Sequence, residues 1–250
     1  MSKVTMIGVM LFTLLFSVCS IAMGSLVGYW PFDEGSGNVA ADASGNGNDG
    51  ELVGNPTWVA GNFGGALEFD GAASYVNVPH ADALSPQTNM TFAAWFRPNV
   101  TINAADGAYR LMSKNNDIFF LFNYEQIGQL GFLIKSAAGT NNAVHSTTAE
   151  WAAGQWYHVA GTFDGAELKI YVNGVLEATN AFVGEAGTSG LDLWIGADDL
   201  PSFFPGAIDD IRLYDTVLTE AEISVVMDTT SAVQPSGKLV STWAEIRNSR

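Results

Sequence analysis

The stretch Phe204-Pro205-Gly206-Ala207-Ile208-Asp209-Asp210-Ile211-Arg212-Leu213-Tyr214 does most to decide the fold of this chain, because it predicts a long strand near the C-terminus. Successive side chains of a strand point to opposite faces. One face then carries Ala207, Asp209, Ile211 and Leu213. We expect this face to lie in the core, which would bury the Asp209 carboxylate. A buried carboxylate is costly without a partner, so Asp209 needs backbone N–H groups, a cationic side chain or a metal ion.

The composition favours one large all-β domain or two small ones. The 250 residues are 48% hydrophobic and only 14% charged, with 27 glycines and 12% aromatic residues, which is typical of a β sandwich with glycine-rich turns. The formal net charge of −16 repels nucleic acid and anionic membrane surfaces and attracts divalent cations. We therefore expect no nucleic-acid partner.

Residues 1–24 are predicted to be a secretory signal peptide. Lys3 precedes an apolar run at 6–16, and the small residues Ala22 and Gly24 precede a cleavage position before Ser25. The run is short for a transmembrane span. Cys19 leaves a lipoprotein as an alternative, although the preceding valine fits a lipobox poorly. We expect a secreted or cell-surface protein, without membrane insertion after signal removal and without disulfides.

The rest of the chain predicts many short strands separated by turns, and one helix. The predicted strands are 26–32, 66–70, 74–78, 90–97, 109–114, 117–124, 129–135, 143–147, 155–164, 166–173, 175–182, 190–196 and 206–214. Asn173-Gly174 suits a two-residue hairpin turn between two of them. Thr219 with Glu222 forms a capping-box pattern at the start of the helix. This pattern predicts an all-β, antiparallel sandwich over 25–228 with one short C-terminal helix, followed by a tail at 229–250.

Several motifs in order resemble a known family. They are Tyr29–Gly37, Asp42–Gly50, Leu67–Gly71, Tyr75–Pro79, Trp156–Gly165, Tyr171–Gly174 and the late strand quoted above. Together they resemble LamG-like jelly-roll domains of the concanavalin A-like superfamily, over roughly residues 26–227. The resemblance implies two sheets packed face to face, with the first and last strands close together. It also implies a secreted, mostly non-catalytic module that binds glycans or extracellular proteins.

A structural calcium ion is the first expected ligand, because the superfamily often has one held by a carboxylate of the last strand. Ca²⁺ takes six to eight oxygens from carboxylates, carbonyls and water. The family fold would bring Asp33, at the end of the first strand, near Asp209. The 42–50 loop adds Asp42 and Asn46 as weaker candidates. The alternative is that Asp209 accepts backbone N–H bonds while Asp33 caps a turn.

A glycan is the second expected ligand, because sugars stack on exposed aromatic rings. Trp194 and Tyr171 point away from the core faces predicted for their strands, and Phe203 lies in the 198–204 loop. We predict that these three residues bind ligand. The alternative is that the rings pack against a neighbouring loop or strand. No single residue identifies a sugar.

Catalysis is not expected. Retaining glycosidases place two carboxyl groups about 5–5.5 Å apart, and the Glu-x-Asp-x-Glu strand motif of jelly-roll enzymes is absent from the sequence. Asp209 and Asp210 would face opposite sides of a regular strand. His158 is predicted to be structural, and the three histidines match no zinc motif. A structural or adhesive module without a small ligand and a hydrolase with atypical carboxylates remain as alternatives.

Overall fold

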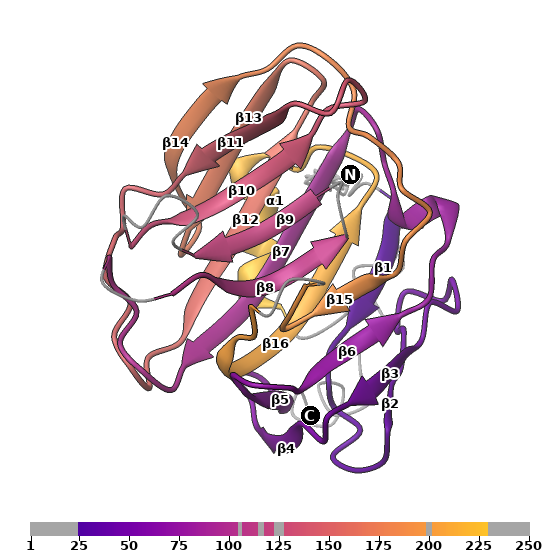
Figure 1. The fold of residues 1–250 in the computed structure, drawn as a ribbon, viewed down its shortest axis with the longest axis vertical. Helices are drawn as coiled ribbons and strands as arrows, with labels where there is room; N and C mark the ends of the chain where they lie inside the picture. Colours follow the sequence, from indigo (N-terminus) through magenta and orange to yellow (C-terminus); the bar gives the residue numbers. More distant parts are fainter. Residues whose placement is uncertain (1–24, 105–106, 115–117, 123–127, 199–201, 230–250) are drawn as a thin grey trace, which may run out of the picture.

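The computed structural model describes residues 25–104, 107–114, 118–122, 128–198 and 202–229. Within these residues two eight-stranded sheets pack face to face, and all the strand pairs in them are antiparallel. A single short helix follows the last strand (Figure 1). The prediction of an antiparallel jelly-roll sandwich with a short C-terminal helix is confirmed. The predicted signal peptide and the tail beyond Thr229 lie outside the described residues.

Sheet A has the order β14-β13-β12-β7-β16-β5-β4, and β1 also pairs with β16. Its strands are β1 (Leu26–Trp30), β4 (Thr57–Ala60), β5 (Gly65–Asp70), β7 (Met90–Pro98), β12 (Tyr157–Phe163), β13 (Glu167–Val172), β14 (Val175–Ala181) and β16 (Pro205–Tyr214). The first and last strands of the domain are therefore neighbours, as the resemblance implied.

Sheet B has the order β11-β10-β9-β8-β15-β6-β3-β2. Its strands are β2 (Val39–Ala40), β3 (Gly50–Val53), β6 (Tyr75–Val78), β8 (Tyr109–Lys114), β9 (Ile118–Phe122), β10 (Leu130–Lys135), β11 (Asn141–His145) and β15 (Leu193–Ile195). A 3-10 helix, η1 (Asp82–Leu84), lies between β6 and β7. The short strands β2, β3 and β4 were not predicted.

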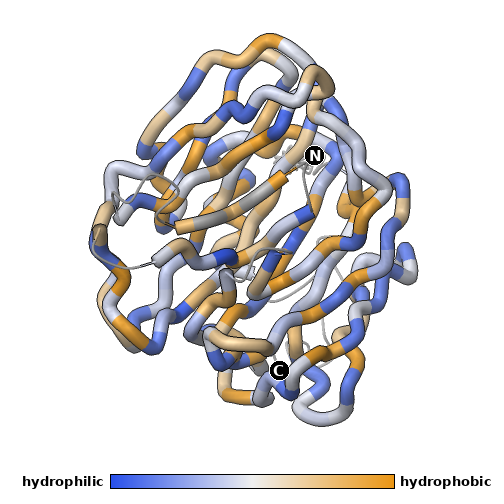
Figure 2. The backbone as a smooth tube through the Cα atoms, in the orientation of Figure 1, coloured by the Kyte–Doolittle hydropathy of each residue, from blue (hydrophilic) through white to orange (hydrophobic). Residues whose placement is uncertain are grey.

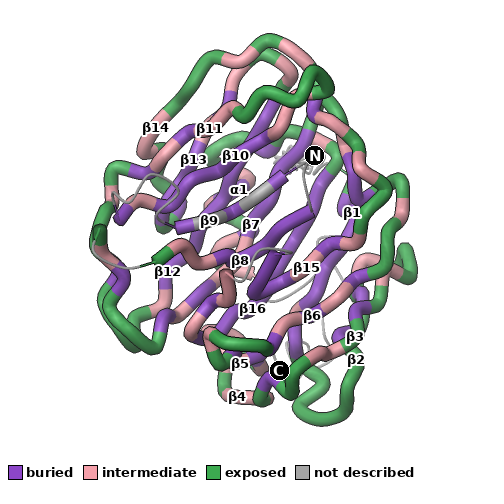
Figure 3. Tube along the Cα trace, in the orientation of Figure 1, coloured by how far each residue is buried: buried purple, intermediate pink, exposed green. Residues whose placement is uncertain are grey.

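The main core lies between the two sheets and is rich in aromatic side chains. Apolar and polar residues alternate along many strands, and the centre of the sandwich is buried while the loops are exposed (Figures 2 and 3). The Phe96 ring lies 5.3 Å from the rings of Phe122 and Trp151, and 5.5 Å from that of Tyr157. Aromatic pairs at such distances stabilise beyond the area that they bury.

The β13–β14 hairpin forms as predicted. Asn173 and Gly174 have φ values of 49° and 77°, which are the two positive values that a type I′ turn requires. The Asn173 side-chain oxygen also accepts a hydrogen bond from the His158 N–H at 3.0 Å. The turn is therefore fixed to the neighbouring strand β12.

Helix α1 (Glu220–Asp228) covers part of the outer face of sheet A. Thr219 and Glu222 form the predicted capping box. Ile223 and Val226 pack from the helix onto a second apolar cluster that includes Tyr171 and Tyr214. Part of sheet A is therefore buried on both faces. In the described part of the chain, no helix is long and apolar enough to cross a membrane.

A β-bulge interrupts β16 opposite β7. Asp209 pairs with Trp95 and Arg212 pairs with Ala93, so one strand has an extra residue, and Asp210 has a φ of 52°. The bulge changes which residues share a face. Ile208, Ile211 and Leu213 lie in the main core, whereas Asp209 lies on the opposite, outer face together with Trp95. The expectation that Asp209 lies on the core face is wrong, because it assumed unbroken alternation.

Candidate functional site

Asp209 is fully buried beneath the loop that joins β4 to β5. Its Oδ2 atom accepts hydrogen bonds from the backbone N–H groups of Asn62 at 2.9 Å and Phe63 at 3.1 Å. Its Oδ1 atom has no hydrogen-bond partner in the described structure. The pKa of Asp209 is raised to about 7, chiefly by burial and also by the neighbouring carboxylates of Asp210 and Asp33, while the two N–H donors oppose the shift. Half of this buried carboxylate is therefore left unsatisfied.

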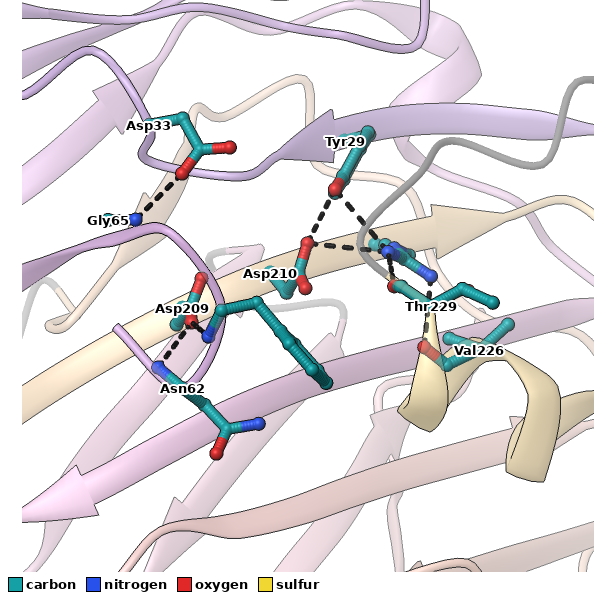
Figure 4. A network of polar contacts seen from close by, with 10 residues as sticks. Tyr29, Asp33, Asn62, Gly65, Asp209, Asp210, Val226 and Thr229 are labelled. Carbon is teal, nitrogen blue, oxygen red and sulfur yellow. Dashed lines mark hydrogen bonds and ion pairs between the residues drawn. The ribbon is translucent and has the colours of Figure 1, made fainter. Parts of the chain in front are cut away.

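The loop needs glycines to approach the two carboxylates. A side chain at Gly61 would meet Asp209 Oδ2, and one at Gly64 would meet Asp33 Oδ1. Gly64 also has a φ of 53°, which is costly for other residues. Asp33 is exposed, and its Oδ1 atom accepts a hydrogen bond from the Gly65 N–H at 2.7 Å (Figure 4). The glycine-rich 61–65 loop was not singled out from the sequence.

Asp210 belongs to a second network of hydrogen bonds at the bulge (Figure 4). Its Oδ1 atom accepts hydrogen bonds from the Tyr29 hydroxyl at 2.5 Å and from Arg212 at 3.3 Å. Arg212 also donates to the carbonyl oxygens of Val226 at 3.1 Å and Thr229 at 2.7 Å. Burial raises the pKa of Asp210, although Arg212 opposes the shift. Asp209 and Asp210 thus lie on the same side of sheet A, and the prediction that they face opposite sides is wrong.

Asp42 and Asn46 make their hydrogen bonds with β1 and with their own loop. The two oxygens of Asp42 accept from the N–H groups of Tyr29, Ser44 and Asn48 at 2.8–3.0 Å. The Asn46 side chain donates to the carbonyl oxygens of Leu26 and Val27, and to the Ser44 hydroxyl. These contacts hold the 42–50 loop against the first strand.

Two of the four predicted metal ligands, Asp33 and Asp209, accept hydrogen bonds from the same 61–65 loop. The charges of Asp33 and Asp209 act on each other, whereas Asp42 and Asn46 are engaged elsewhere. Among the described residues, no group of three or more His, Cys, Asp or Glu side chains is arranged to hold a metal ion. An ion at Asp33 and Asp209 would need backbone carbonyl oxygens or water for most of its ligands.

Three aromatic side chains meet on the outer face of sheet B. Trp194 on β15 stacks on Tyr75 of β6, with ring centroids 4.4 Å apart and ring planes at 29°. Phe203 lies 6.5 Å from Tyr75, in the segment that precedes β16. All three are half-buried, so each keeps part of its surface open to solvent. We call Tyr75, Trp194 and Phe203 the aromatic platform.

The structure brings together two of the three predicted ligand-binding residues, and it adds Tyr75. The alternation Tyr75-Val76-Asn77-Val78, in which the valines lie in the core, could have placed Tyr75 on the outer face. Tyr171 lies on the other sheet and is only 5% exposed, because α1 covers it. The prediction that Tyr171 is available to a ligand is therefore wrong.

His158 lies inside sheet A beside Trp95, with ring centroids 5.3 Å apart. Burial lowers the pKa of His158 to about 3, and the positive charge of Arg212 contributes to the shift. His158 is therefore neutral at physiological pH. A buried, neutral imidazole packed against an indole fits a structural role.

The chain is similar in sequence to one curated protein, and similar in fold to several solved structures. Pappalysin-1 from Mus musculus is 34% identical over 92 residues, which cover 35% of this chain and 6% of the relative. The binding domain of Paraclostridial Mosquitocidal Protein 1 aligns with a TM-score of 0.69 at 15% identity, over 82% of this chain and 52% of that chain. This chain thus spans a small part of the curated relative and about half of the toxin domain.

Domain 4 of AbnA, a GH43 extracellular arabinanase from Geobacillus stearothermophilus, was solved in complex with arabinotriose. It aligns with a TM-score of 0.65 at 20% identity, over 82% of this chain and 99% of that chain. At these identities the two structures establish the fold alone.

A family model described as the concanavalin A-like lectin/glucanases superfamily matches residues 70–224, which is more than half of the chain. The match includes β6 to β16 and the start of α1, and with them the whole aromatic platform and Asp209. The chain belongs to this laminin G-like family of the concanavalin A-like lectin/glucanases superfamily.

Proposed function

We propose that this protein is a secreted, non-catalytic module that binds glycans through the aromatic platform. The observation that carries the proposal is the meeting of Trp194, Tyr75 and Phe203 on the solvent-facing side of sheet B. Aromatic rings bury large apolar areas at a low cost in side-chain entropy. The C–H faces of a sugar ring fit such a surface, while the Asn77 side chain beside Trp194 supplies a polar group.

The comparisons support a glycan as the ligand and an extracellular location for the protein. Domain 4 of AbnA, which matches nearly over its full length, holds arabinotriose and belongs to an extracellular enzyme. Binding domains on this fold serve larger proteins, as in the mosquitocidal toxin. The predicted signal peptide at 1–24 is consistent with export.

A glycan array probed with the purified mature protein tests the proposal. Trp194→Ala should abolish binding to any glycan that the wild-type protein retains. Trp156→Ala is the matched control, because Trp156 is also half-buried but lies beside Arg97, with the guanidinium carbon 5.0 Å from the centre of the tryptophan ring. Equal losses for the two variants, or no glycan bound by the wild type, would contradict glycan binding through the platform.

The second candidate is an extracellular protein partner, or an adhesive module without a small ligand. It is favoured by the likeness to a toxin binding domain. This alternative predicts that the protein binds a cell-surface protein even after glycosidase has removed that protein's glycans. The binding should be lost in Trp194→Ala. Turnover of a glycoside by the wild-type protein would instead overturn the non-catalytic part of the proposal.

We also propose that Asp209 and Asp33 hold a structural calcium ion with backbone oxygens of the surrounding loops. The unpartnered Oδ1 atom of Asp209 and the raised pKa support the proposal, because a cation there would stabilise the charged carboxylate. Calcium should raise the melting temperature of wild-type protein after treatment with EDTA, but not that of Asp209→Asn. An equal response of both proteins, or none, would count against calcium at this position.

A further inference from the structure

A polar pocket lies beside the β6–β15 strand pair and has no assigned role. Its volume is about 520 Å³, which is within the range of about 300–1,000 Å³ common for ligand pockets. Its lining is mostly polar and includes His80, Asp82, Ser85, Gln87, Thr188 and Ser189. Hydroxyl, amide and imidazole groups therefore surround a space large enough for a small ligand.

Hydrogen bonds orient His80 at one side of this pocket. The Nζ atom of the buried Lys114 lies 2.9 Å from His80 Nδ1 and also donates to the Leu191 carbonyl oxygen. Since an ammonium group has only donors, Nδ1 accepts and Nε2 carries the proton. His80 Nε2 then donates to Asp82 Oδ1 at 3.2 Å. The imidazole is thus held in one tautomer between two charged groups.

The other walls are also held by hydrogen bonds. The Ala186 N–H donates to the Gln87 carbonyl oxygen at 2.8 Å, and the Leu191 N–H donates to the Ser189 hydroxyl at 3.3 Å. Ser85 follows η1, and its N–H donates to the Asp82 carbonyl oxygen at 3.0 Å. The pocket is therefore largely formed before any ligand arrives, which lowers the entropic cost of binding.

Ser85 provides an independent sign of a missing partner. The residue lines the pocket and is only 7% exposed, and its hydroxyl has no hydrogen-bond partner within the described structure. A buried hydroxyl without a partner destabilises a protein. Because the Ser85 Oγ atom is itself buried, a ligand hydroxyl in the pocket would meet it after rotation of the serine side chain, and would then remove that penalty.

The charges around the pocket favour a neutral ligand. The Asp82 carboxylate and the strongly acidic chain would repel an anion. The nearest ammonium, that of Lys114, is buried and already donates to His80 and Leu191. A cation is also disfavoured, because Asp82 is the one carboxylate among the lining residues, its Oδ1 atom already accepts from His80 Nε2, and its side chain is fully exposed to water. A neutral, hydroxyl-rich molecule is left as the best match.

Asp192 links this pocket to the aromatic platform. It receives a hydrogen bond from Asn77, which pairs with Trp194 across the two strands. Gly190 lines the pocket only four residues before Trp194, which limits their separation to about 14 Å of extended chain. One oligosaccharide could therefore contact both places.

We propose that this pocket binds one neutral sugar unit of an oligosaccharide of which another unit stacks on the aromatic platform. The inference rests on the proposed function, because it assumes that the protein binds a glycan. The residues that it concerns are those of the pocket, which are separate from the aromatic platform. It predicts that binding needs at least two sugar units for full affinity, with hydroxyl recognition by Ser85 and its neighbours.

Nuclear magnetic resonance of the isotope-labelled mature protein can distinguish the two sites. The probes are the neutral trisaccharides arabinotriose, xylotriose and cellotriose, with glucuronate and calcium chloride as charged controls. A binding trisaccharide should shift the signals of both the Trp194 indole and the pocket residues Gln87 and Gly190. Ser85→Ala should weaken binding about three- to tenfold, as expected for one lost hydrogen bond, and should not unfold the protein.

Thr188→Trp provides a second test, because Thr188 is exposed and a large ring there would fill the pocket. It should remove the pocket shifts and leave those at Trp194. Thr179→Trp, at an exposed position on the β14 edge of sheet A, is the matched control and should change neither.

Each pattern of shifts has a distinct meaning. Shifts at Trp194 alone would overturn the pocket and leave the proposed function standing. Shifts in the pocket alone would support sugar binding in the pocket and overturn glycan binding by the aromatic platform. Pocket shifts with glucuronate or calcium only would overturn the neutral-sugar assignment. No shift at either place with any trisaccharide would overturn both proposals.

Discussion

Arg212 donates to Asp210 across the bulge in β16, and both side chains are almost completely buried. The same guanidinium donates to the carbonyl oxygens of Val226 and Thr229 at the end of α1. It also lies 4.6 Å from the centre of the Tyr29 ring. One cation therefore joins the last strand to the first strand and to the helix.

Arg212→Met should destabilise the protein strongly, because it leaves the buried Asp210 carboxylate without its cation. Breaking one side of a buried ion pair costs about 3–5 kcal/mol. Urea unfolding at neutral pH measures the change. Arg97→Met is the control, since Arg97 and Glu68 form a partly exposed pair at 3.3 Å, worth about 1 kcal/mol or less. Similar losses for the two variants would contradict a central role for Arg212.

Asp209 should make the calcium-free protein less stable as the pH rises towards neutrality. Its folded pKa of about 7 lies above the ordinary value of 3.8, so the folded state binds a proton more tightly. The contribution of this proton to the free energy of unfolding is complete below about pH 4. It falls by up to about 1.4 kcal/mol per pH unit as the pH rises to 7. Asp209→Asn cannot titrate, so its stability relative to wild type should increase between pH 5 and 8. If the two proteins, measured in EDTA, differ in stability by the same amount from pH 5 to pH 8, the pKa of Asp209 is not raised.

His158 should have the opposite effect at acid pH. Its folded pKa of about 3 lies below the ordinary value of 6.5, so the unfolded chain binds the proton more tightly. Stability is therefore lost as the pH falls from 6.5 towards 3, by about 2 kcal/mol at pH 5. Denaturant unfolding of wild type and His158→Gln at pH 7 and pH 5 isolates this contribution. If both proteins lose the same stability, His158 titrates normally in the folded state.

Thr219→Ala should destabilise α1 by about 1 kcal/mol, because the threonine hydroxyl accepts a hydrogen bond from the Glu222 N–H. Thr219→Ser keeps this acceptor and should restore the stability. Hydrogen exchange of the α1 amides measures the local effect. Exchange that is unchanged in Thr219→Ala would show that packing on Tyr171, and not the cap, holds the helix.

Regular patterns made most of the fold predictable from the sequence. The Asn173-Gly174 turn and the Thr219–Glu222 capping box each depend on neighbouring residues only, and both formed as predicted. Strands β2 to β4 were missed because they are short and lie in a glycine-rich region. The bulge at Asp210 was missed because alternation alone does not reveal an inserted residue.

Site residues were harder to predict because their environment comes from distant segments. Asp209 is buried as expected, but by the 61–65 loop on the outer face. Tyr171 points away from the main core as predicted, yet α1 covers it. Burial beneath a loop or helix depends on tertiary packing, which strand periodicity does not report.

The position of β16 has a consequence for synthesis. This strand lies between β7 and β5 and also pairs with β1, although it is the last of the described strands to leave the ribosome. Until residue 214 has emerged, β1 lacks its partner and sheet A is split in two. Pairings over such long sequence separations form slowly. Sheet A is therefore completed only when translation of the domain is nearly finished.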